Sequence, residues 1–180
     1  MTIEAVSVTA SDGTVLEAEV ARSDHTERAA VVLCHPHPQY GGTMRSLVIS
    51  ELFRALPEAG ITALRFNFRG VEASAGSFDD GRGERLDVLG ALDALSAAAP
   101  DLPVFLVGWS FGADMACSTP DARVAGWVGI ALPLRFVDDA ALTHVAADPR
   151  PKHLILAEHD EFRDAEWVRS EEHTSELQSH

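Results

Sequence analysis

The sequence VFLVGWSFG, residues 104–112, combines a short apolar run with a serine between two glycines. The run Val104–Val107 is typical of a buried strand, and the small residues after Gly112 can begin a helix. Ser110 is therefore predicted to stand at a sharp strand-to-helix turn, where glycines on both sides allow close approach and strained serine backbone angles. This context makes Ser110 a candidate nucleophile. The alternative is an ordinary serine at a glycine-rich strand end.

Strands and helices alternate on both sides of this stretch. Asp12-Gly13 separates two apolar runs and is a strong hairpin signal, so the chain should open with an antiparallel pair. The later alternation predicts a mostly parallel sheet with helices on both faces, an α/β fold. The expected strands are Ile3–Val8, Val15–Val20, Ala29–Cys34, Ile61–Phe66, Val104–Val107, Val124–Ala131 and His153–Ala157. The expected helices are Met44–Leu56 with Thr43 as N-cap, Glu84–Ala99, and a short one after Ser110, whereas residues 133–149 have no decisive pattern.

In open sheets of this kind the ligand site lies at the carboxyl ends of the strands. We therefore expect the loops after Cys34, Phe66, Val107 and Ala157 to converge. A serine nucleophile needs a base that is held by a carboxylate. The loop after Ala157 carries the candidate for this carboxylate, because an acidic residue lies there just past the end of the strand. Asp160 is the predicted acid and Glu158 the fallback. Asp160 could instead be only an N-cap for a helix from Glu161.

The base should be a histidine one further strand along the chain, and no such segment follows. His159 is too close to Asp160 in sequence to lie between it and Ser110. We therefore expect a domain that is incomplete at its C terminus, without its last strand, histidine loop and final helix. This predicts little or no turnover by the 180-residue chain.

The last twelve residues, RSEEHTSELQSH, resemble the in-frame translation of a sequencing adapter. Residues 169–180 are therefore expected to be a non-native tail, and residues 1–168 a single domain.

The loop CHPHPQYGGT, residues 34–43, is predicted to supply one of two backbone amides that bind an oxyanion. Phe111, the residue after the nucleophile, supplies the other amide. Pro36 and Pro38 have no N–H and cannot serve. By analogy with loops that begin His-Gly, the candidate is the amide of His37, and Tyr40 to Gly42 are alternatives.

Cys34, His35 and His37 could instead form a metal cluster with His159 and Asp160. Their spacing fits no standard zinc pattern, and we predict no metal or other cofactor. Arg65 and Arg69, which bracket Phe66-Asn67-Phe68, are expected to make structural hydrogen bonds rather than to clamp a substrate anion.

Composition narrows the possible partners. The net charge is −14, and the fourteen Lys and Arg residues form no run, which disfavours nucleic acid and anionic membranes. We find neither a signal peptide nor an apolar run of membrane-spanning length. Cys34 and Cys117 lie in apolar segments and suit buried free thiols. A cytoplasmic location is therefore expected, whereas the oligomeric state stays open.

Four motifs carry a family resemblance: HPHPQYGGTM, LRFNFRGVEASAGSFDDGRGERLD, LVGWSFGADMA and LILAEHDEF, within residues 35–162. Together they resemble small bacterial α/β-hydrolases related to dienelactone hydrolases and acyl-peptidases. The resemblance implies the α/β-hydrolase fold and a serine hydrolase, with Ser110 and Asp160 matching nucleophile and acid. Glu72 departs from it, because relatives tend to have glycine there.

These observations together predict an esterase-like serine hydrolase. Its expected substrate is a carboxylic ester or similar small acyl compound, cleaved through an acyl-enzyme on Ser110. The alternative is a non-catalytic protein of the α/β-hydrolase fold that binds a small molecule or a partner.

Overall fold

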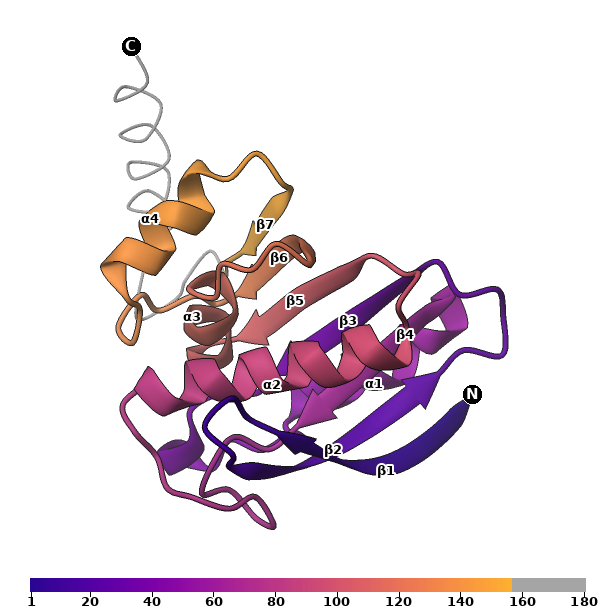
Figure 1. Ribbon diagram of the computed structural model, residues 1–180, viewed down its shortest axis with the longest axis horizontal. Coiled ribbons are helices and arrows are strands. Elements are labelled where there is room, and N and C mark those ends of the chain that lie inside the picture. Colours follow the sequence, from indigo (N-terminus) through magenta and orange to yellow (C-terminus); the bar gives the residue numbers. More distant parts are fainter. Residues whose placement is uncertain (157–180) are drawn as a thin grey trace.

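The computed structural model describes residues 1–156, which contain a seven-stranded mixed sheet (Figure 1). The strand order is β1-β2-β4-β3-β5-β6-β7. Both pairs that involve β2 are antiparallel, and the other four pairs are parallel. The strands are β1 (Thr2–Thr9), β2 (Val15–Arg22), β3 (Ala29–Cys34), β4 (Ile61–Phe66), β5 (Val104–Trp109), β6 (Val124–Ile130) and β7 (Lys152–Ile155). The predicted α/β fold is confirmed.

The predicted hairpin between β1 and β2 is also present. Gly13 takes a positive φ of 89°, and Ala10 and Thr14 close the turn with a backbone hydrogen bond of 2.8 Å. A left-handed glycine after Asp12 is what an Asp-Gly turn requires. The chain therefore opens with the expected antiparallel pair.

Helices cover both faces of the sheet. Figure 1 shows α2 in front of the strands and α1 behind them. The helices of the described part are α1 (Leu47–Ala55), α2 (Arg82–Ala98), α3 (Phe111–Cys117) and α4 (Asp139–Ala147), with short 3-10 turns at Pro38–Tyr40 and Pro57–Ala59. Because parallel strands are joined by crossovers, this arrangement follows from the alternation of strands and helices in the sequence.

The central strand β3 is buried on both faces. Val31 and Leu33 pack in a cluster with Ile49 and Phe53 of α1. Val32, like its neighbours at alternate positions of β3, belongs to a larger cluster that includes side chains of α2 and α3. A strand between two apolar layers reads as a continuous apolar run, and for this reason the sequence predicted its bounds correctly.

The start of α1 differs from the prediction. The helix begins at Leu47, after Ser46, and not at Met44 after a Thr43 cap. Met44 is buried in the preceding loop, where its N–H donates to the side-chain oxygen of Asn67 at 2.8 Å. Leu47, expected on the apolar face, is 74% exposed. A tertiary hydrogen bond has thus taken the first predicted turn out of the helix.

The other differences are small. Helix α2 starts two residues before the expected Glu84, and the segment without a pattern contains α4, whose N-cap Asp138 accepts a hydrogen bond from Ala141. Residues 157–180, which include the expected boundary at residue 168, lie outside the described residues. In residues 1–156 no helix is long and apolar enough to cross a membrane.

Candidate active site

Three loops meet at the carboxyl ends of β3, β4 and β5. The link between the first two is His35, whose Nε2 accepts the backbone N–H of Phe68 at 3.0 Å. The turn after β5 contacts the loop after β3, because Gly112, at the start of α3, lies against the carbonyl groups of Cys34 and His35. The predicted convergence is therefore confirmed for these loops, and the loop after Ala157 falls outside the described residues.

Ser110 stands at a strained turn between β5 and α3. Its φ and ψ are 55° and −123°, a combination that non-glycine residues rarely adopt. The Ser110 N–H donates to the Ile130 carbonyl at 2.8 Å, and its own carbonyl accepts the N–H of Ala113 at 2.8 Å. These bonds to the neighbouring strand and to the following helix hold the turn in place.

The two flanking glycines are required by close backbone contacts. A Cβ on Gly108 would lie 2.1 Å from the carbonyl oxygen of Gly112. A Cβ on Gly112 would lie 2.2 Å from the carbonyl oxygen of Cys34. The sequence prediction that these glycines permit close approach is confirmed.

A groove of about 540 Å³ opens beside Ser110. Of the described residues, none that lines it is Asp, Glu, Lys or Arg. They come from the loop after β3, the start of α1 and the turn after β5: Pro36, His37, Tyr40, Gly41, Gly42, Ser46, Leu47, Trp109 and Ser110. A second hollow, of about 450 Å³, shares Gly41 and Gly42 with the first and is lined on its other side by Arg69 and Glu72.

His37 is held in an aromatic cluster beside this groove. Its ring centroid lies 4.6 Å from that of Tyr40 and 5.1 Å from that of Phe111. Phe78 and Phe136 complete the cluster, each 4.9 Å from His37. The ring Nδ1 accepts the N–H of Gln39 at 3.2 Å, and burial lowers the pKa of His37. The ring is therefore neutral, and through its bond to Gln39 it holds the backbone of the loop after β3 in place.

The two predicted oxyanion donors thus lie in one packed unit. The rings of His37 and Phe111 touch; His37 lines the groove beside Ser110, and Phe111 begins α3 directly after Ser110. Among the hydrogen bonds of residues 1–156, none uses the backbone N–H of His37 or of Phe111. Neither amide is therefore engaged by another acceptor in this part of the chain.

His35 is a structural side chain. It is fully buried, and burial lowers its pKa to about 4. Its Nδ1 bonds to the carbonyl of Pro36 at 2.6 Å, so both ring nitrogens are occupied.

The thiol of Cys34 is also fully buried, and burial raises its pKa. Both cysteines are free and buried, as predicted.

These contacts argue against the metal alternative within the described part of the chain. A neutral imidazole with two hydrogen bonds and a protonated thiol are poor ligands. Over residues 1–156, no three His, Cys, Asp or Glu side chains come together in a way that could hold an ion. His159 and Asp160, the other members of the hypothetical cluster, lie outside that part.

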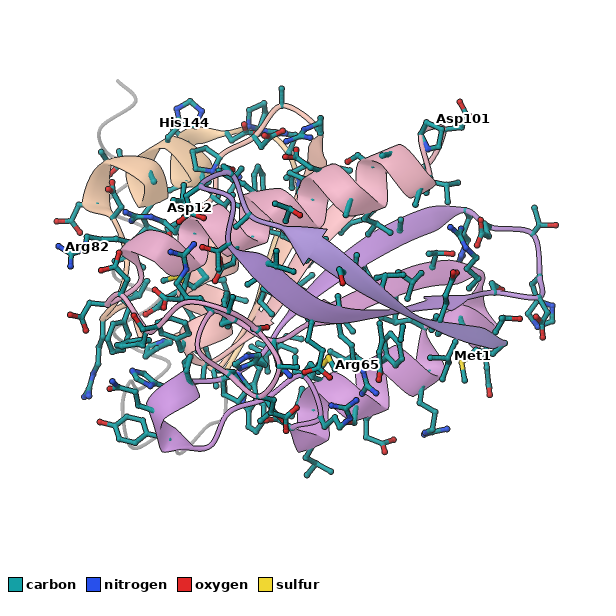
Figure 2. All side chains as sticks on the ribbon, turned by 60° about the horizontal axis from the view of Figure 1, so that its bottom comes forward. Met1, Asp12, Arg65, Arg82, Asp101 and His144 are labelled. Atoms are coloured by element: carbon teal, nitrogen blue, oxygen red, sulfur yellow. The ribbon has the colours of Figure 1, made fainter. Side chains whose placement is uncertain are left out.

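Arg65 and Arg69 make structural hydrogen bonds, as predicted. The Arg69 guanidinium binds Asp87 at 2.7 Å and Asp12 at 2.9 Å, and its backbone N–H also donates to Asp87. Burial raises the pKa of Asp87, against the lowering effect of the Arg69 hydrogen bonds. Arg65 binds Glu19 at 2.6 Å. Figure 2 places Arg65 on the α1 side of the sheet and Asp12 at the β1–β2 turn beside α2.

Sequence reasoning missed Asp114, one helical turn after Ser110. Its buried carboxylate accepts three backbone N–H groups from the segment after β6, those of Leu134, Arg135 and Phe136, at 2.8, 2.9 and 3.0 Å. Phe136 packs against both His37 and Phe111. A carboxylate in an otherwise small and apolar helix was the signal that could have marked this anchor.

The predicted acid Asp160, the fallback Glu158 and the neighbouring His159 lie outside the described residues, as does the tail 169–180. Their roles stay predictions. The same holds for the expected absence of a catalytic histidine downstream.

The chain is similar to known proteins in sequence and in structure. The family model of the alpha/beta hydrolase domain matches residues 27–180. An uncharacterized protein of Rickettsia prowazekii is 31% identical over 157 residues, which cover 86% of this chain and 66% of that protein. The chain thus spans just under two thirds of that relative's length.

Two solved structures are similar to this one, each with a TM-score of 0.82. An alpha-beta serine hydrolase homologue from Coxiella burnetii is 31% identical, and the match covers 94% of this chain and 81% of that one. A serine hydrolase without a lid from Xanthomonas campestris is 30% identical, with 97% and 79% covered.

Proposed function

Because the chain belongs to the alpha/beta hydrolase domain family, we propose that it is a serine hydrolase that cleaves carboxylic esters or similar small acyl compounds through an acyl-enzyme on Ser110. The observation that carries this proposal is the strained turn at Ser110, which opens onto a groove with two unused backbone amides beside it. Strained backbone of this kind persists where the surrounding structure enforces it, and such positions cluster at active sites.

The proposed reaction has two steps. Ser110 Oγ attacks the carbonyl carbon of the ester, and its proton passes through a histidine base to the departing alcohol. The negative charge on the carbonyl oxygen is stabilised by the amides of Phe111 and His37. Water then attacks the acyl-enzyme, which releases the acid and returns the proton to Ser110. No metal or cofactor enters this scheme.

The predicted acid lies outside the described residues. We assign the acid to Asp160 and expect the base further downstream. Among the described residues, neither His35 nor His37 forms a hydrogen bond with Ser110, and both rings are engaged elsewhere. This observation favours, as a second candidate, a non-catalytic protein of the same fold that binds a small molecule.

The entrance to the proposed site is open. Tyr40 and Leu47, at the edge of the groove, are 87% and 74% exposed. The Xanthomonas relative is described as having no lid. We propose the same for this protein, with direct access of small substrates to Ser110.

The first prediction concerns Ser110→Ala, tested with p-nitrophenyl acetate and butyrate. Release of p-nitrophenol should fall to background, because the nucleophile is gone. An acyl adduct on Ser110, detected by mass spectrometry, should form in the wild type and not in the variant.

A matched control is Ser96→Ala, which removes a buried hydroxyl without a partner on α2. This variant should behave like the wild type. If neither p-nitrophenol release nor the adduct depends on Ser110, the proposal fails and the binding protein becomes the leading candidate.

A further inference from the structure

Two large apolar side chains stand exposed at the edge of the Ser110 groove. Leu47 is the first residue of α1, and Tyr40 ends the 3-10 turn after β3. The other large exposed apolar residues of the described chain lie elsewhere, near the β1–β2 hairpin or on β7: Met1, Ile3, Val15, Leu154 and Ile155. Exposed apolar surface that gathers at a concave site is typical of a place where a ligand binds.

Leu47 is exposed for a specific reason. The loop after β3 continues to Ser46 because Met44 is tied to Asn67, and α1 therefore starts with Leu47 at the rim of the groove. The core beneath α1 is filled by Ile49 and Phe53 instead. Leu47 therefore adds apolar area to the groove and not to the core.

The groove offers no charge to an anionic substrate. Among residues 1–156, its lining contains no Asp, Glu, Lys or Arg, and the arginine that lines the adjoining hollow, Arg69, is paired with Asp87 and Asp12. Glu72 in that hollow is paired with Arg45. The net charge of −14 repels anions further.

We propose that Leu47 and Tyr40 form a subsite for an uncharged, aliphatic acyl chain, so that the protein prefers neutral aliphatic esters over esters whose acyl chain ends in a carboxylate. This inference rests on the proposed function. A hydrocarbon chain would cover the two apolar side chains, whereas a carboxylate at its end would lose water without gaining a partner.

The test uses two matched probes: p-nitrophenyl hexanoate and the mono-p-nitrophenyl ester of adipic acid, which has the same chain length and a terminal carboxylate. The wild type should favour the hexanoate in Ser110-dependent kcat/KM by at least about ten-fold. Leu47→Arg should reduce that ratio by about five-fold or more, because it adds a cation near the carboxylate and removes apolar area. Leu47→Ala should lower kcat/KM for the hexanoate alone.

The matched control is Ile3→Arg, which adds the same charge at a 51% exposed residue of β1. It should leave the ratio unchanged, since Ile3 is not part of the groove. If Leu47→Arg changes the ratio no more than Ile3→Arg does, the subsite is overturned while Ser110-dependent release still supports the proposed function.

A binding measurement covers the case in which no Ser110-dependent reaction is seen. Methyl hexanoate is titrated into the Ser110→Ala protein, and amide shifts are followed by NMR. Shifts at Gly41 and Leu47 that are weakened in Leu47→Arg support the subsite even where the proposed function fails. Absent or unchanged shifts overturn it. The subsite is also overturned if Leu47→Arg changes the sedimentation coefficient of the protein but not its binding of methyl hexanoate. Leu47 and Tyr40 would then form an interface between copies of the chain.

Discussion

At the scale of single residues, Glu72 shows how backbone strain escapes sequence reading. Its φ of 47° lies in the left-handed region, where glycine is favoured. The family resemblance had marked this position as one where relatives tend to have glycine. The glutamate stays in this conformation while its carboxylate binds Arg45 at 3.1 Å and accepts the Asn67 amide at 2.9 Å.

We predict that Glu72→Gly is more stable than Glu72→Ala by about 1 kcal/mol in urea unfolding, because alanine keeps the strain and glycine removes it. Both variants lose the same ion pair, so the comparison isolates the backbone. Glu51, on the exposed side of α1, is the control position: there alanine should be the more stable, by a similar amount. The same order at both positions would mean that Glu72 is not strained.

At the scale of elements, the side chain of Asp114 ties the segment between β6 and α4 to α3. The three N–H groups that Asp114 accepts join α3 to residues 134–136, and Ala131 and Leu134 in this segment have positive φ values of 50° and 52°. Asp114→Asn should lower the free energy of unfolding by about 2 kcal/mol, because the amide accepts fewer of these bonds and carries no charge. Urea unfolding measures the loss.

Amide hydrogen exchange shows which part of the protein is destabilised in Asp114→Asn. The amides of residues 134–136 should exchange faster in Asp114→Asn than in the wild type, while those of β3 keep the same order of protection. Asp139→Asn, at an exposed position in α4, is the control and should change neither quantity. Unaltered exchange at residues 134–136 would show that Asp114 is not the anchor.

Elements also show what the sequence could predict. The bounds of β3 and β4 were predicted correctly because β3 is a continuous apolar run and β4 is mostly apolar, and both lie in the middle of the sheet. The start of α1 was predicted wrongly because Met44 is drawn into the loop by Asn67, 23 residues away. The anchor at Asp114 was missed for a similar reason, since its partners are 20 to 22 residues further along. Local periodicity contains no information on such contacts.

At the scale of the whole molecule, His35 makes stability depend on pH. In the unfolded chain its pKa should be near 6.5, and in the folded protein burial lowers it to about 4. As pH falls below 6.5, the unfolded state binds a proton that the folded state does not, so stability is lost until the pH reaches about 4. The difference between the two pKa values corresponds to about 3 kcal/mol.

We predict that the wild type loses about 3 kcal/mol more than His35→Gln between pH 7 and pH 4, measured by urea unfolding at each pH. Glutamine can still accept the N–H of Phe68 but does not titrate. Other groups titrate equally in both proteins and cancel in the comparison. Parallel pH profiles for the two proteins would contradict the burial of a neutral His35.

The hydrogen bond from Ser110 to Ile130 also sets an order of events during synthesis. Ser110 is added to the growing chain twenty positions before the partner that fixes its backbone, and Cys34, against which Gly112 packs, emerged much earlier. A nascent chain that ends before β6 therefore contains the bond from Ala113 to Ser110 but lacks the bond from Ser110 to Ile130. The strained turn at Ser110 should therefore be among the last local features to form during synthesis, once β6 has paired with β5.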